Sequence, residues 1–128
     1  MRLAYVDSSC LVAIALVAAD HQRVSSWLYG FDHLYASNLL EAELRSAMAR
    51  ERVGSSAAIL LSSIIWVYPE RPLTPEYELI LTQGYLRGAD LWHLACALYL
   101  KEELEEVSFL SLDEKQTAVA RSMGFALE

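Results

Sequence analysis

The sequence is poor in basic residues. Its 128 residues hold 10 lysines and arginines against 17 aspartates and glutamates, which gives a formal net charge of −7. Nonspecific binding to nucleic acids depends on Lys and Arg side chains that neutralise phosphates. The net charge therefore argues against a basic surface for nucleic acid, and any contact with phosphate needs another source of positive charge.

Cysteine is also scarce, and long apolar runs are absent. Cys10 and Cys96 fall in apolar helical patterns without the spacing of metal ligands, which predicts buried thiols in a reducing compartment, by default the cytoplasm. The uncharged run 10–19 is about half as long as a membrane span. It follows Asp7, where a secretory signal would carry positive charge, and Asp20 ends it. We expect a folded segment and no membrane span.

The size and composition of the chain fit one folded domain over residues 1–128. Compact domains cluster near about 100 to 150 residues. The sequence is 55% hydrophobic and 21% charged, which argues against disorder. Because this apolar share is high for a protein in water, we expect part of the surface to lie in an interface.

Short apolar runs alternate with segments of helical periodicity. The runs predict strands at residues 3–6, 33–36, 65–68 and 107–112. Capping residues, among them Ser37 and Thr74, and the apolar spacing predict helices at 8–19, 20–29, 38–48, 55–64, 75–83, 90–102 and 113–124. This alternation predicts an α/β fold, a three-layer α/β/α sandwich with a short, mainly parallel central sheet.

Four acidic residues fall where the predicted strands end or helices begin. Asp7 follows the first strand, Asp113 follows the fourth, Asp90 opens a helix, and Glu43 lies in the helix after the second strand. Ligands of open α/β sheets gather at such junctions. Each aspartate alone is also a good helix cap, and Asp113 has Gln116 at the spacing of a capping box. The joint pattern is what indicates a site.

Carboxylates crowded into one cleft repel each other, and hard divalent cations relieve this repulsion. Magnesium or manganese is the expected occupant. Such a cation lowers the pKa of a bound water and stabilises charge during cleavage of a phosphodiester bond. It also supplies positive charge that attracts phosphate to an acidic protein.

Four segments contain the candidate acids: Tyr5-Val6-Asp7-Ser8-Ser9, Glu43-Leu44-Arg45-Ser46-Ala47, Ala89-Asp90-Leu91-Trp92-His93-Leu94-Ala95 and Phe109-Leu110-Ser111-Leu112-Asp113. In their order and spacing, and across nearly the whole chain, these segments resemble the PIN-domain family. The resemblance implies a PIN fold and an endoribonuclease that uses magnesium or manganese. It also implies an acidic pocket, supported by Ser9, whose catalytic and metal-binding residues are Asp7, Glu43, Asp90 and Asp113.

Among PIN domains, a chain of this length is most similar to VapC toxins of toxin-antitoxin pairs. That similarity implies an RNA substrate, a cognate antitoxin protein and a homodimer. Two departures from the common pattern, Leu91-Trp92 after Asp90 and Ser111 where Thr is frequent, concern the pocket's details and leave the acids in place. Two alternatives stay open: an RNA-processing nuclease without a toxin role, and a non-catalytic PIN-like module for protein contacts.

Some residues allow more than one interpretation. Glu41 and Glu43 both flank the apolar stripe of their helix, so periodicity does not choose between them, while the resemblance favours Glu43. His93 lies three residues from Asp90 and could share a metal with it. Its helical phase is nearly opposite the apolar face, however, which predicts a solvent-facing structural histidine.

Aromatic and basic residues are not interleaved along the sequence. We therefore interpret the three tryptophans and seven tyrosines as core or interface residues more readily than as platforms for RNA bases. Arg45, Arg50 and Arg52 form the densest basic cluster. We interpret that cluster as a solvated helix face, with contacts to phosphate or to an acidic partner as the alternative.

Overall fold

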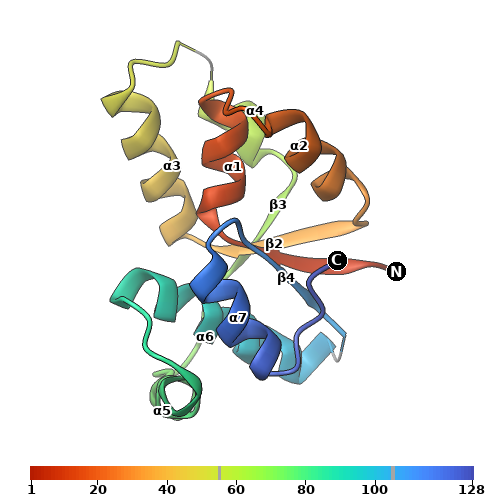
Figure 1. Ribbon diagram of the computed structural model, residues 1–128, viewed down its shortest axis with the longest axis vertical. Helices are drawn as coiled ribbons and strands as arrows, with labels where there is room; N and C mark the ends of the chain where they lie inside the picture. The colour runs from red at the N-terminus through yellow and green to blue at the C-terminus, as the bar shows by residue number, and fades with distance from the viewer. Residues whose placement is uncertain (55, 105) are drawn as a thin grey trace.

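Four parallel strands form the central layer of the protein in a computed structural model that describes residues 1–54, 56–104 and 106–128 (Figure 1). The strands are β1 (Leu3–Val6), β2 (His33–Ser37), β3 (Ile64–Val67) and β4 (Ser108–Leu110). Their order in the sheet is β3-β2-β1-β4, and every pair is parallel. The carboxyl ends of all four strands therefore meet at one edge of the sheet.

Helices cover both faces of this sheet. They are α1 (Ser8–Ala15), α2 (His21–Tyr29), α3 (Leu39–Arg50), α4 (Ala57–Leu61), α5 (Thr74–Gln83), α6 (Gly88–Leu104) and α7 (Glu114–Ser122). Figure 1 shows α1 to α4 on one side of the strands and α5 to α7 on the other. The expected three-layer α/β/α sandwich is confirmed. Among the described residues, none of the helices has the length and apolarity that crossing a bilayer requires.

The strands divide the interior into two apolar cores because successive side chains of a strand point to opposite faces. Ala4 and Val6 of β1 pack with α1 to α4, whereas Tyr5 between them packs with α5 to α7. In β4, Phe109 and Leu110 divide in the same way. A parallel sheet buried on both faces explains why these strands read as continuous apolar runs.

Two predicted helix boundaries were wrong. The first helix ends at Ala15 rather than at residue 19, and Val17 takes a left-handed backbone conformation with φ of 52°. Ser37 is the last residue of β2 and not a cap, since Asn38 is the N-cap of α3. The reason is tertiary: the N–H of the buried Ser37 donates to the hydroxyl of Tyr5, 3.1 Å away.

Smaller shifts affect five other elements. The helix predicted at 55–64 is the shorter α4, and Ile64 is instead the first residue of β3, whose last is Val67. Ser55, the predicted start of that helix, lies outside the described residues. Thr74 is in the first turn of α5 rather than its cap, and α6 extends to Leu104. Strand β4 is shorter than predicted.

The connector between α5 and α6, residues 84–87, lies against α7. A Cβ added at Gly84 would be 2.9 Å from Cγ2 of Val119, a stiff and buried side chain of α7. Glycine is therefore what permits this close approach. Leu86 is buried in the same core and anchors the connector, while Tyr85 and Arg87 on either side of it are exposed.

Candidate functional site

Asp7 and Asp113 leave neighbouring strands at the same edge of the sheet. Val6 pairs with Leu110, and the N–H of Asp7 donates to the carbonyl of Leu110 at 2.9 Å. Both aspartates cap the helix that follows: Oδ2 of Asp7 accepts from the N–H of Ser9 at 3.0 Å, and Oδ1 of Asp113 accepts from the N–H of Gln116 at 2.8 Å. Each aspartate is thus a helix cap, and the pairing of β1 with β4 brings the two caps together.

Gln116 links three of the acidic segments. Its fully buried side chain donates from Nε2 to Oδ1 of Asp7 at 3.2 Å and to the backbone carbonyl of Asp90 at 3.1 Å. Its Oε1 accepts from the hydroxyl of Ser111 at 2.6 Å. The amide therefore holds α1, α6 and α7 in register around the carboxylates.

Sequence reasoning assigned Gln116 only a local role in a capping box. In a complete box, its side chain would accept from the N–H of Asp113. Instead that N–H donates to the hydroxyl oxygen of Ser111, which leaves the Gln116 amide for the contacts between segments. The spacing from Asp113 was the available signal, but it could not reveal partners distant in the sequence.

Ser9 also connects two of these segments. Its hydroxyl oxygen accepts from the N–H of Leu112 at 3.1 Å, and its own N–H bonds to Asp7. The side chain therefore ties the start of α1 to the loop that precedes Asp113. The two bonds place Ser9 beside Asp7 and the segment of Asp113, while its support of a functional pocket stays a prediction.

Glu43 is held by a chain of buried hydrogen bonds that sequence reasoning missed. The hydroxyl oxygen of Tyr5 accepts from the N–H of Ser37 and lies 2.9 Å from Nδ1 of His93, with which it shares a hydrogen bond. Nε2 of His93 lies 2.5 Å from Oε1 of Glu43. This network fixes the orientation of the Glu43 carboxylate.

The prediction that His93 faces solvent was wrong. Its side chain is only 1% exposed because α6 packs against β2, α5 and α7, which buries five consecutive residues from 93 to 97. Helix α6 is therefore buried on more than one face, so its helical period could not predict which side chains face solvent. The ring nitrogens are engaged by Tyr5 and Glu43, so His93 does not share a metal with Asp90 in this arrangement.

The contacts also distinguish Glu41 from Glu43. Oε2 of Glu41 accepts from Nε of Arg45 at 2.7 Å, one helical turn away and on the exposed side of α3. Glu43 instead reaches the buried His93. Arg45 thus belongs to a surface ion pair, in line with a solvated helix face.

The pKa of Asp90 is affected by the other three acids. Partial burial raises the pKa of its carboxyl above the ordinary 3.8, and the negative charges of Asp7, Asp113 and Glu43 raise it further. The Arg87 guanidinium, 3.9 Å from Oδ2 of Asp90, opposes this rise in pKa. Asp7, Asp113 and Glu43 therefore lie close enough to Asp90 for their negative charges to affect its carboxyl group.

The donor atoms suit a hard divalent cation. One carboxylate oxygen of Asp113 and one of Glu43 accept no hydrogen bond from any described residue, which leaves them free to bind. Carboxylate oxygens are the ligands that Mg²⁺ and Mn²⁺ prefer. In the described part of the chain, however, no three His, Cys, Asp or Glu side chains are close enough to form a ready-made metal centre.

Comparison with known protein families matches most of this chain to a family. The family model described as PIN domain matches residues 4–122, a range that includes all four acids, the whole of β2, β3 and β4, and all of β1 except Leu3. No curated protein is significantly similar in sequence.

Replacing the buried amide tests its linking role. Gln116→Leu keeps a similar volume but leaves Oδ1 of Asp7 and the hydroxyl of Ser111 without their partner. The free energy of unfolding should fall by about 1–3 kcal/mol, the cost of unsatisfied buried polar groups. Urea unfolding measures this. Gln83→Leu, at an exposed position on α5, is the matched control, and an equal loss in both variants would contradict the role assigned to Gln116.

The raised pKa of Asp90 predicts a dependence of stability on pH. A carboxyl whose folded pKa lies above its unfolded value stabilises the fold at low pH, and this stabilisation is lost as pH rises from about 3.8 through the folded pKa. Asp90→Asn removes the loss, so in EDTA at pH 7 the variant should be at least as stable as wild type.

The advantage of Asp90→Asn should shrink as the pH falls toward 3.8. Thermal melts over this pH range provide the measurement. Asp20→Asn is the control, because Asp20 forms an exposed ion pair with Arg23 outside the acidic cluster. An Asp90→Asn variant that is less stable than wild type at pH 7 in EDTA would show that repulsion does not dominate at this site.

Proposed function

Because this chain belongs to the PIN-domain family, we propose that it is a magnesium- or manganese-dependent endoribonuclease whose active site consists of Asp7, Glu43, Asp90 and Asp113. PIN domains are generally nucleases, hydrolases that cleave phosphodiester bonds. The observation that carries the proposal is the buried Gln116 amide, which joins the segments of Asp7, Asp90 and Asp113 at the carboxyl edge of the sheet.

The four carboxylates would hold the cation, and each is supported differently. Asp7 uses both oxygens in hydrogen bonds, which fix its plane, while Glu43 is oriented through His93. Asp90 and Asp113 line a pocket open to solvent. When bound, the cation would lower the pKa of a water molecule and stabilise negative charge on the phosphate and the leaving oxygen.

The residues of the chain contribute chiefly by position. Asp7 and Asp113 lie at the N-termini of α1 and α7, where the helix dipoles reduce the cost of their negative charge. Nε2 of His93 holds Oε1 of Glu43, which keeps that carboxylate directed at the cluster. The protein thus holds acidic groups in place before RNA arrives, as electrostatic catalysis requires.

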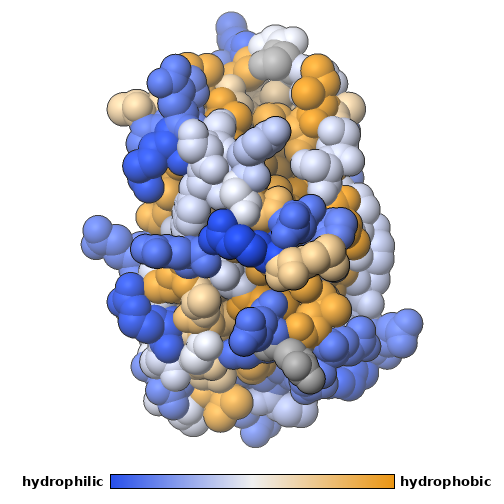
Figure 2. Space-filling model, turned by 90° about the vertical axis from the view of Figure 1, so that its right-hand side faces the viewer, coloured by the Kyte–Doolittle hydropathy of each residue, from blue (hydrophilic) through white to orange (hydrophobic). Residues whose placement is uncertain are grey.

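We further propose that the protein is the toxin of a toxin-antitoxin pair, acts in the cytoplasm and forms a homodimer. A groove of about 670 Å³ on the face opposite to the Tyr5 core would receive the antitoxin. Its apolar lining comes from α1, α2, β2 and α4: Leu11, Ile14, Leu28, Leu34, Ile59 and Leu60. Figure 2 shows hydrophobic patches among hydrophilic residues on the side of the molecule where Figure 1 marks both chain ends. Such patches favour a partner protein.

Two other functions remain candidates. An RNA-processing nuclease would use the same acids without an antitoxin, and a non-catalytic module would use only the apolar surface. The buried support for the carboxylates weighs against the second, because a module for protein contacts gains nothing from holding four acids together.

Cleavage of RNA should require a divalent cation and the four acids. Asp7→Asn, Asp90→Asn and Asp113→Asn should each lower kcat by about 100-fold or more, the usual loss when a stabiliser of transition-state charge is removed. Glu43→Gln should reduce activity far more than Glu41→Gln, because Glu41 is paired with Arg45 on the surface. The measurement is cleavage of defined RNAs by purified protein in magnesium, in manganese and in EDTA.

Thermal melts separate the metal site from the choice of RNA. Excess manganese, about a hundredfold above its dissociation constant, should stabilise wild type by roughly 2 to 3 kcal/mol, and Asp7→Asn much less. Undiminished cleavage in EDTA, or equal stabilisation of wild type and Asp7→Asn, would contradict the metal mechanism.

The toxin role predicts an effect on growth. Expression of wild-type protein should slow growth of a bacterial host, Asp7→Asn should not, and co-expression of the small protein encoded beside it should restore growth. Ile59→Asp, a charge in the apolar groove, should weaken that rescue while leaving RNA cleavage intact. Normal growth despite soluble, RNA-cleaving protein would favour the processing role instead.

A further inference from the structure

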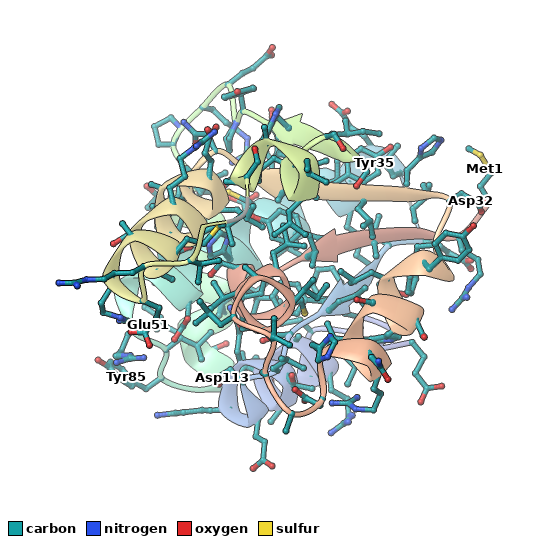
Figure 3. All side chains as sticks on the ribbon, turned by 90° about the horizontal axis from the view of Figure 1, so that it is seen from above. Met1, Asp32, Tyr35, Glu51, Tyr85 and Asp113 are labelled. Atoms are coloured by element: carbon teal, nitrogen blue, oxygen red, sulfur yellow. The ribbon has the colours of Figure 1, made fainter. Side chains whose placement is uncertain are left out.

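Beside the four acids lies a pocket that pairs an aromatic ring with basic groups. It has a volume of about 280 Å³ and is lined by Tyr85, Leu86, Arg87, Asp90, Asp113 and Lys115. Tyr85 is 65% exposed, and Nζ of Lys115 lies 4.8 Å from the centre of its ring. Figure 3 places Tyr85 and Asp113 at the same end of the molecule, away from Met1 and Asp32.

This pocket is built by tertiary contacts. The connector 84–87 approaches α7 closely because residue 84 is glycine, and the buried Leu86 holds it there. Tyr85 and Arg87 are therefore presented by an anchored segment, next to Lys115 in the first turn of α7. A large aromatic side chain that is mostly exposed on a fixed segment is available to bind a ligand.

The charges indicate what kind of ligand fits. The chain has a net charge of −7, and the carboxylates of Asp90 and Asp113 line the pocket. Arg87 and Lys115 supply local positive charge where an approaching phosphate would otherwise meet only acids. An exposed ring beside two cations suits a nucleotide, because an unpaired base stacks on the ring and its phosphate meets the basic groups.

We propose that Tyr85, Arg87 and Lys115 form a subsite for one unpaired nucleotide of single-stranded RNA, next to the phosphodiester bond that the acids would cleave. The ring of Tyr85 stacks on the base, while Lys115 and Arg87 contact the phosphate. Because a base within a duplex has no free face, the subsite selects single strands. This proposal rests on the nuclease function proposed above and adds the part of the substrate that the site recognises.

The test measures binding separately from cleavage. Single-stranded oligoribonucleotides with one 2-aminopurine are titrated with protein in EDTA, where the metal mechanism allows no cleavage. Fluorescence anisotropy gives the Kd, and quenching of 2-aminopurine reports stacking. Tyr85→Ala should raise the Kd about fivefold to a hundredfold and abolish quenching, whereas Tyr85→Phe should keep both. A duplex of the same sequence should bind more weakly than the single strand.

Lys115→Gln should raise the Kd and reduce the slope of log Kd against log salt by about 0.7, the value for one lost phosphate contact to a single strand. Matched controls use similar groups elsewhere. Tyr29→Ala removes a 91% exposed tyrosine of α2, and Lys101→Gln removes a lysine that also lies over a ring, 4.6 Å from the centre of Phe125. Neither control should change RNA binding.

Cleavage assays distinguish failure of the subsite from failure of the nuclease function. Tyr85→Ala should raise KM with little change in kcat. Binding that depends on Tyr85 in a protein that never cleaves RNA would support the subsite and contradict the nuclease function. The subsite is overturned if wild type does not bind the single strand, or if Tyr85→Ala matches Tyr29→Ala. Loss of dimerisation or antitoxin binding with normal RNA binding in Tyr85→Ala would assign the ring to a protein interface instead.

Discussion

The parallel pairing of β1 with β4 is the constraint on which the acidic site depends. Val6 lies beside Leu110, so the residues that follow the two strands emerge together at the carboxyl edge of the sheet. A shift of one residue in this register would turn every side chain of the strand to the other face of the sheet. Residues that now fill one core would then point into the other. The pairing therefore fixes both the apolar interior and the position of Asp7 relative to Asp113.

Bringing carboxylates together costs free energy, and several local features reduce that cost. The N-termini of α1 and α7 stabilise Asp7 and Asp113, and the Gln116 amide donates to Asp7. Asp90 receives less support, and its pKa is raised first by partial burial and then by the negative charges of the other three acids. A fold selected only for stability would avoid such a cluster. Its presence is the pattern expected where function requires a locally unfavourable arrangement.

Tyr5 couples the core to the site. Its ring stacks on Phe109 with centroids 5.9 Å apart, so it fills the layer between β1, β4 and α6. Its hydroxyl joins Ser37 to His93, and His93 in turn holds Glu43. Tyr5 thus connects the core formed with α5 to α7 to a carboxylate on α3, which lies on the opposite side of the sheet. Changes in core packing can reach Glu43 through this path.

Patterns of neighbouring residues determined the alternation of strands and helices, the two-sided sheet and the three candidate aspartates, because apolar period and capping chemistry are local properties. The choice of Glu43 over Glu41 came from the resemblance to PIN domains. Contacts between distant segments decided the rest. His93 is buried because three elements surround α6, Ser37 ends a strand because Tyr5 binds its N–H, and Gln116 serves Asp7, 109 residues away. Lys115 and Tyr85 are far apart in the sequence, and no periodic pattern connects them. The approach of the connector to α7 nevertheless brings the Lys115 side chain over the Tyr85 ring. This juxtaposition depends on how the connector packs against α7, and only the folded chain fixes the distance between Lys115 and the ring of Tyr85.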